Sequence, residues 1–444
     1  MQTATLICGA IGLDTDLSLV YQLFALMLCL LIFSRFSLKF QVPEVSCRRR
    51  LPRYATADEP FEYRITVTNQ GSRIEKDLRI LDNPKVIPPD RAQFRNMREP
   101  FEETRNAYDR WIGFHRFVYL QRLNTGITVK TADVPDVDRM GQAEVVIEAA
   151  PLRRGDVQFE SITVLHPDPL GLNFGIIDFP ERDHLTVLPK RYPVSDKLLF
   201  NSGRNFQPGG VNATWSIGES DEFASLRDYR DGDPIRKIHW ASTAKRNKPV
   251  VKEFQDEFFV RQGLVVDNSS EVQKQQVQKQ QVQKQEIQKQ AAPKDTSASP
   301  YADPVFEAQI IVAASLLTAS PLRDGLMDLF TLGKHAEVCT AGRGFGDCAT
   351  QLEVLAKLNR ADSDVEQLSR LLTDRARQLS GCLFVLGSYT PFQQMLVSAI
   401  ESQGVETRIF ITEDKAKRSA NAIDYPTGAL IIDPSNIEEA LASL

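Results

Sequence analysis

The carboxyl-terminal part of the sequence constrains the fold most, because short apolar runs alternate there with longer amphipathic segments. Such alternation is typical of a parallel sheet with helices on both faces. The residue pattern predicts strands at 263–267, 326–332, 336–341, 382–386, 405–411 and 429–433. It predicts helices at 303–320, 351–358, 365–380, 391–403 and 436–444. We therefore expect an α/β domain over residues 263–444.

Residues 41–200 show a different pattern, in which apolar and polar side chains alternate with a period of two. The clearest example is 61–69, which ends at an Asn-Gln-Gly turn signal, as expected of a half-buried strand. Proline and glycine separate further short runs of this kind, so we expect a small antiparallel sandwich that resembles an immunoglobulin-type fold. Residues 91–122 are charged and aromatic, and they predict a partly helical insertion. The other runs are 78–80, 143–148, 157–165 and 185–188.

The amino terminus contains an apolar stretch, residues 17–36, with the length that a membrane-spanning helix needs. No Lys or Arg precedes Arg35, so the stretch lacks the basic start of a secretory signal. Several basic residues follow it, which predicts a membrane anchor over 1–40 with the body on the cytoplasmic side of the membrane. Residues 3–13 are too short to span a membrane alone. Two interpretations of them remain: the thin first arm of a membrane hairpin, or a frayed segment that leads into the apolar stretch.

The six cysteines contain no Cys-x-x-Cys pair, which indicates neither a disulfide framework nor a zinc site.

A glutamine-rich insert separates the first strand of the α/β domain from its first helix. Its five-residue repeat advances by roughly 140° per period on a helix, so the valines make no apolar stripe. We therefore expect residues 271–300 to be either disordered or a frayed polar helix. Two roles for this insert remain: an interaction arm rich in glutamine, or a repeat expansion that is tolerated in a surface loop.

The densest polar signal lies within residues 201–262, which we expect to join the two domains. Carboxylates and guanidinium groups interleave there with two aromatic residues, around a Gly-Asp-Pro turn and a single His-Trp pair. The run from Leu226 to Trp240, followed by Ala241, Ala244 and Lys245-Arg246, closely resembles the signature of the bacterial domain of unknown function 58 family. That resemblance implies a chain anchored in the bacterial inner (plasma) membrane, with a β-rich segment and a von Willebrand factor type A-like α/β domain. It also implies a MoxR-type AAA+ ATPase as a partner.

The expected fold class is therefore a multidomain α+β chain. It comprises an amino-terminal membrane helix, an immunoglobulin-like β-sandwich and a von Willebrand factor type A-like Rossmannoid domain. We expect arginines of the signature to form bidentate pairs with its aspartates. Such pairs would join the sandwich to the α/β domain, with Trp240 packed beneath them, and an exposed part could dock a partner. The residues expected to carry these contacts are Arg227, Asp228, Tyr229, Arg230, Asp231, Gly232, Asp233, Arg236, His239, Trp240 and Lys245.

A metal site is the next hypothesis, because the type A-like domains bind a divalent cation through an Asp-x-Ser-x-Ser loop. Here Asp267 and Ser269 match that loop, while Glu271 stands where the third hydroxyl should be. Residues 387–390 contain no aspartate where the family has one. The resemblance therefore implies a degenerate site, at which Mg²⁺ or Mn²⁺ is the cation to consider.

Two functions follow from these observations. The first is a non-enzymatic interaction or scaffold protein, which acts with a MoxR-type ATPase in the assembly or maturation of other proteins. The alternative is a metal-dependent hydrolase of phosphodiesters or envelope material, with Asp231, Asp233 and His239 as ligands or acid–base groups. No nucleic-acid partner is expected, since the net charge is −5. The glycine-rich run 342–347 lacks the spacing of a dinucleotide-binding motif.

Overall fold

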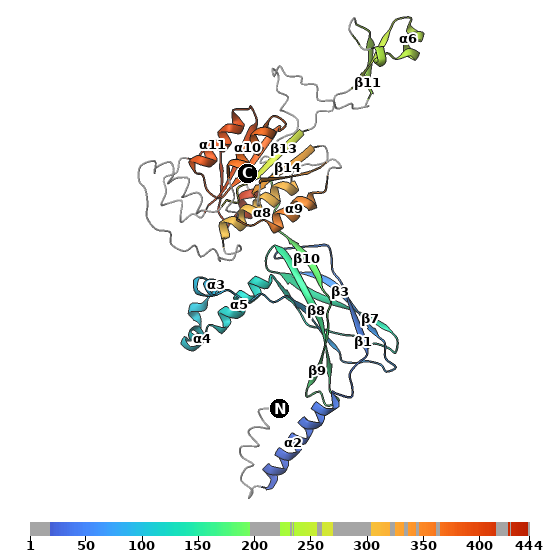
Figure 1. Ribbon diagram of the computed structural model, residues 1–444, viewed down its shortest axis with the longest axis vertical. Coiled ribbons are helices and arrows are strands. Elements are labelled where there is room, and N and C mark those ends of the chain that lie inside the picture. Colours follow the sequence, from blue (N-terminus) through green and yellow to red (C-terminus); the bar gives the residue numbers. More distant parts are fainter. Residues whose placement is uncertain are drawn as a thin grey trace.

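The computed structural model shows two folded domains, a helical insertion, an amino-terminal helix and a small module that contains the signature (Figure 1). Several parts of the sequence discussed above lie outside the residues that the structure describes: the glutamine-rich repeat, residues 3–13, Asp231, Gly232 and Glu271. The described residues are 18–195, 223–230, 233, 235–254, 260–269, 303–319, 325–332, 336–342, 346–360, 365–413, 425–426 and 428–442.

Two sheets enclose the core of the first domain. One sheet has the order β1-β3-β7-β5, and the other has the order β2-β10-β8-β4-β6 with β9 paired to β8. Apolar side chains of both sheets, such as Ile65, Ile147 and Phe159, form one buried cluster between them. The strands are β1 (Val45–Arg50), β2 (Tyr54–Thr56), β3 (Phe61–Asn69), β4 (Arg79–Pro84), β5 (Ile127–Val129), β6 (Ala132–Asp133), β7 (Gln142–Pro151), β8 (Gly155–Pro167), β9 (Phe174–Phe179) and β10 (Asp183–Leu188).

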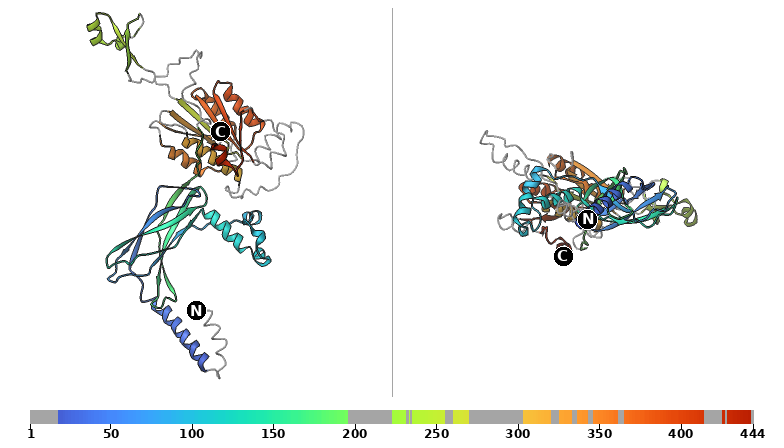
Figure 2. Two further views of the ribbon diagram at one scale, coloured as in Figure 1. Left: turned by 180° about the vertical axis from the view of Figure 1, so that it is seen from behind. Right: turned by 90° about the horizontal axis from the view of Figure 1, so that it is seen from below.

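A helical insertion follows β4 and projects sideways from this domain in both side views (Figures 1 and 2). It consists of α3 (Arg91–Asn96), the short 3₁₀ helix η1 (Glu102–Thr104), α4 (Ala107–Ile112) and α5 (Phe114–Thr125). Asp90 starts α3 with a capping box, and Asn106 accepts a hydrogen bond at the start of α4.

The second domain is built on a six-stranded sheet with the order β15-β14-β13-β16-β17-β18. All neighbouring strands are parallel except β14 and β15, which form an antiparallel edge pair. Helices α8, α9 and α13 pack on one face, and α10 and α11 pack on the other. The strands are β13 (Val260–Val266), β14 (Gly325–Leu332), β15 (Ala336–Ala341), β16 (Gly381–Leu386), β17 (Glu406–Thr412) and β18 (Leu430–Ile432). The helices are α8 (Pro304–Ala319), α9 (Cys348–Lys357), α10 (Val365–Ala376), α11 (Pro391–Glu401) and α13 (Ile437–Ala442).

The two domains share an extensive junction, and Arg154 lies at its centre. This side chain leaves the turn between β7 and β8 and is 2% exposed. Its Nε and Nη2 donate to the backbone carbonyls of Leu355 (3.2 Å) and Leu358 (2.6 Å) at the end of α9. Its Nη1 pairs with Glu307 on α8, and its guanidinium lies over the Phe306 ring. Arg154 thus places its positive charge at the carboxyl-terminal end of a helix, where the helix dipole favours it.

Contacts around Arg154 extend the junction. Leu188, at the end of β10, belongs to the apolar core of the α/β domain. The backbone N–H of Tyr192 donates to Ser315 Oγ (2.9 Å), and Tyr54 donates to Glu353 (3.2 Å). The segment after β10 is therefore anchored on the second domain.

The predicted membrane helix is wrong, and with it the fold class that began with such a helix. Residues 18–37 do form a helix, α2 (Ser18–Ser37). However, none of the helices among the described residues has the length and apolarity needed to cross a membrane. The uninterrupted apolar run, 23–33, is about 17 Å long at 1.5 Å per residue, whereas a bilayer core is about 30 Å thick. At its end, Ser34 is buried and accepts a hydrogen bond from Asn173 Nδ2 (2.6 Å), so the last turn packs on the sandwich.

Candidate interaction module and strand-end site

The signature residues form a small module of two strands, one 3₁₀ turn and one short helix. Strand β11 (Phe223–Asp228) pairs antiparallel with β12 (Val250–Phe254), and η3 (Ile235–Lys237) and α6 (Trp240–Arg246) lie between them in sequence. The backbone N–H of Tyr229 donates to the carbonyl of Pro249, and that of His239 donates to the carbonyl of Val250. These bonds tie the connecting segment to the hairpin.

One bidentate ion pair closes the loop of this module. The two terminal nitrogens of Arg227 donate to the two carboxylate oxygens of Asp233, at 2.7 and 2.8 Å. The backbone N–H of Arg230 donates to the same carboxylate at 2.9 Å. The hydrogen bonds from Arg227 lower the pKa of Asp233 to about 2. The carboxylate is therefore ionised near neutral pH and occupied by donors of its own loop.

His239 caps the helix of the module. Its Nδ1 accepts a hydrogen bond from the backbone N–H of Ser242 (3.3 Å) and lies 2.7 Å from Ser242 Oγ. Thr243 Oγ1 in turn accepts a hydrogen bond from the N–H of Val250 (3.1 Å). These side chains hold α6 against β12.

The other expected contacts of the signature are only partly formed. Among the described residues, Asp228, Arg230 and Arg236 form no ion pair, so one of the expected arginine–aspartate pairs is present. Trp240 is 65% exposed, which shows that the prediction of a buried tryptophan beneath the pairs is wrong. The physical reason is size: a two-stranded hairpin with a short helix cannot cover an indole. Tyr229 is half-buried, and Lys245 is exposed in the last turn of α6.

The residues predicted to bind metal lie at the end of β13, where the parallel strands of the sheet terminate. Asp267 and Ser269 are both buried, and Asp267 Oδ1 accepts hydrogen bonds from Ser269 Oγ (2.6 Å) and from its N–H (3.1 Å). Asp267 Oδ2 accepts a hydrogen bond from Gln393 Nε2 (2.8 Å), which reaches back from α11. Gln309 Nε2 donates to the backbone carbonyl of Asp267 (3.1 Å).

This arrangement does not fit a divalent cation. Gln393 Oε1 accepts the N–H and the hydroxyl of Thr390 in a capping box, which fixes the amide so that its NH₂ group points at Asp267. A hydrogen-bond donor therefore stands where a cation would approach Oδ2. In the described parts of the chain, no group of three or more His, Cys, Asp or Glu side chains could hold a metal ion. Sequence reasoning did not identify Gln393, although Thr390-x-x-Gln393 before an apolar run is a recognisable capping-box pattern.

The model of the family described as "Protein of unknown function DUF58" matches residues 225–300, which begin within β11. The chain carries the DUF58 signature. The uncharacterised protein YeaD of Bacillus subtilis (strain 168) is 31% identical over 110 residues, and this match covers 24% of the chain and 27% of YeaD. The predicted relationship to the DUF58 family is confirmed. The chain thus matches about a quarter of the length of that relative.

Three solved structures show a weak likeness to the chain. A PapD-like domain of human CEP192 is 13% identical, with coverage of 34% of this chain and 88% of that chain and a TM-score of 0.18. The CARDB domain of a Pyrococcus furiosus protein is 10% identical, with 33% and 96% coverage and a TM-score of 0.18. A cohesin module from a Clostridium perfringens glycoside hydrolase is 7% identical, with 34% and 100% coverage and a TM-score of 0.16. These TM-scores are too low to support a statement about fold or function.

Proposed function

We propose that this protein is a non-enzymatic interaction protein and that the small module of residues 223–254, called the DUF58 module below, docks a partner protein. The observation that carries the proposal is the exposure of two large apolar side chains on this module. Ile235 is 68% exposed and Trp240 is 65% exposed. Tryptophan is enriched among the residues that dominate binding energy at interfaces. The transfer of an exposed apolar side chain from water into an interface contributes favourable binding free energy.

The small core of the module supports the same function. Among its described side chains, only Val250 and Val251 are buried. A two-stranded hairpin is marginally stable unless a further apolar surface covers it. A partner that covers Ile235 and Trp240 would supply this surface.

The polar groups of the module favour a structural role over catalysis. The carboxylate of Asp233 is bound by Arg227 and by the backbone of Arg230. The Nδ1 atom of His239 caps α6. Two of the three groups that the hydrolase alternative would use, Asp233 and His239, are thus engaged in holding the module together, which supports docking as the function. The third, Asp231, lies outside the described residues.

By resemblance to the DUF58 family, we propose a MoxR-type AAA+ ATPase as the partner and the assembly or maturation of other proteins as the process. The same resemblance suggests a von Willebrand factor type A-like character for the α/β domain. The cytoplasmic position of the body stays a prediction.

The test measures binding of the full chain to a purified MoxR-type ATPase of the same bacterium by biolayer interferometry. We expect Trp240→Ser to weaken binding at least about tenfold, which corresponds to about 1.4 kcal/mol. Trp111→Ser is the matched control, because Trp111 is 82% exposed but lies on the helical insertion. Equal affinities of the Trp240→Ser variant and the wild type would refute the docking role of the module. A photo-crosslinker at position 240 that captures a different protein in cells would refute the choice of partner.

A further inference from the structure

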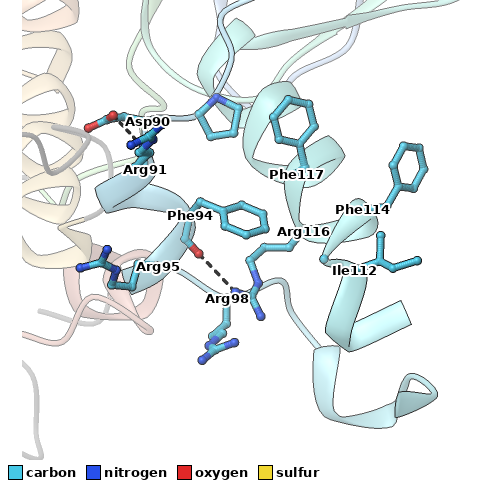
Figure 3. Close-up of a pocket in the computed structure, with 11 residues that line it drawn as sticks. Asp90, Arg91, Phe94, Arg95, Arg98, Ile112, Phe114, Arg116 and Phe117 are labelled. Atoms are coloured by element: carbon cyan, nitrogen blue, oxygen red, sulfur yellow. Dashed lines mark hydrogen bonds between the residues drawn. The ribbon is translucent and has the colours of Figure 1, made fainter. Parts of the chain in front are cut away.

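The helical insertion contains an open groove that takes no part in the docking function proposed above. It has a volume of about 750 Å³ and lies between α3 on one side and α4 and α5 on the other (Figure 3). The insertion projects away from both the sandwich core and the DUF58 module (Figures 1 and 2). A surface here is therefore separate from the one proposed above.

The floor of the groove is rigid and electrically neutral. Arg116 is buried and pairs with Glu102 through two of its nitrogens, one of them Nε at 3.0 Å from Oε2. Its third nitrogen donates to the carbonyl of Phe94 (3.2 Å), and its guanidinium lies over the Phe94 ring. Gly113 turns the chain from α4 to α5 with a φ of 68°, and a Cβ atom there would lie 2.7 Å from Phe94 Cζ. The helices are thus held at a fixed separation.

The two sides of the groove differ in chemistry. On the α3 side, Arg91 and Arg95 are exposed one turn apart, and no carboxylate of the described residues forms an ion pair with either. Arg98 follows them, also exposed, at 3.5 Å from Glu102. On the opposite side, Phe114 is 61% exposed and Phe117 is 40% exposed, three positions apart on α5. Exposed guanidinium groups therefore border the groove on one side and exposed phenyl rings border it on the other, with the side chains of Arg95 and Phe114 pointing away from each other (Figure 3).

We propose that this groove binds a short acidic segment of another protein, with Phe, Leu or Trp anchors between its carboxylates. Arginine presents a planar fork that suits carboxylates bidentately, and the phenyl rings offer apolar contact to the anchors. Charge complementarity selects the acidic partner. A long polyanion such as nucleic acid is less well matched, because Asp90 lines the groove and Glu103 and Asp109 lie in the same insertion. A segment with two or three carboxylates avoids these like charges.

The test is a selection of random dodecapeptides displayed on phage against the full chain. A protein with both Arg95→Glu and Phe114→Ser serves for counter-selection; both side chains are exposed, so the fold is retained. We expect enriched peptides to carry Asp or Glu beside Phe, Leu or Trp. The peptides should bind the double variant at least about tenfold more weakly in fluorescence anisotropy, and binding should weaken with salt.

Matched controls separate the groove from general charge and apolarity. Arg110→Glu changes an exposed arginine of α4 outside the groove, and Phe101→Ser changes a phenylalanine that is 83% exposed outside it. Both should bind the peptides within about twofold of the wild type. The proposal is overturned by a selection without enrichment, by enriched peptides that are not acidic, or by equal losses in the controls. Groove-dependent binding of oligothymidine or phosphatidylglycerol vesicles, in place of peptides, overturns it as well.

Discussion

Asp233 is the residue whose charge holds the DUF58 module in shape. Hydrogen bonds from Arg227 lower its pKa to about 2, below the ordinary value near 3.9 that applies to the unfolded chain. Because the folded-state pKa is depressed, the contribution of this pair to stability is complete above about pH 4. It is lost as the pH falls through about 2.

We predict that an NMR titration of the Asp233 carboxyl carbon gives a midpoint at about pH 2. In Arg227→Gln the midpoint should rise toward the ordinary aspartate value, because the main donor is lost. Arg246→Gln, at the exposed end of α6, should leave the midpoint unchanged. A midpoint that stays at about 2 in Arg227→Gln would show that the pair does not set the pKa.

Gln393 is the residue that binds the Asp267 carboxylate from α11. Replacing it with leucine removes the donor to Asp267 Oδ2, and the buried carboxylate loses a hydrogen bond. We predict that Gln393→Leu lowers the free energy of unfolding by about 1–3 kcal/mol, measured by urea denaturation. Gln394→Leu is the control, since Gln394 is the exposed neighbour on the same helix. Equal stability of the two variants would contradict the bridging role.

At the scale of elements, the corner between α4 and α5 depends on one glycine. Gly113→Ala adds left-handed strain of about 1–2 kcal/mol and also pushes a methyl group into the Phe94 ring. We predict faster hydrogen exchange across α3, α4 and α5 in this variant. Gly171→Ala is the control for backbone strain alone. The φ of Gly171 is 65°, but no atom lies within 4 Å of the added Cβ. Exchange in the insertion that is no faster than in Gly171→Ala would show that the ring contact is unimportant.

Elements with a clear period were predictable, and contacts that depend on the three-dimensional surroundings were not. The expected strand at 61–69 coincides with β3, because alternate side chains enter the core. The expected helix at 351–358 begins earlier, at Cys348, since Asp347 caps it. Apolar length alone suggested a membrane span at 17–36, whereas the polar end of α2 packs on the sandwich. The exposure of Trp240 was also beyond sequence reasoning, because burial depends on what covers a side chain.

At the scale of the whole molecule, Arg154 joins the two domains. Its guanidinium binds the end of α9 and pairs with Glu307. Burial raises the pKa of Glu307, and Arg154 opposes this rise. We predict that Arg154→Met destabilises the protein by about 3 kcal/mol, because it leaves a carboxylate and two carbonyls in the junction without their donor. Differential scanning calorimetry should then separate one transition into two.

Lys357→Met is the control for this junction, since Lys357 pairs with Asp156 at 3.5 Å but its side chain is 45% exposed. A surface pair of this kind contributes about 0–1 kcal/mol, so the control should unfold much as the wild type does. An Arg154→Met variant that melts like Lys357→Met would disprove the coupling of the two domains through Arg154.

The sequence predicted that the DUF58 residues join the domains, but the structure assigns this role to Arg154. Its partners lie some 150 to 200 positions along the chain, which no local pattern reveals.

The anchoring of residues 192–195 has a consequence for how the DUF58 module can be engineered. The N–H of Ser195 donates to the carbonyl of Leu441, and β13 returns to the centre of the same sheet from Val260. The chain therefore leaves the α/β domain after Ser195 and re-enters its sheet at Val260, and the described module of residues 223–254 lies between these two points in the sequence. We expect that replacing residues 223–254 leaves the sandwich and the six-stranded sheet folded, because both ends of this stretch of chain are tied to the α/β domain.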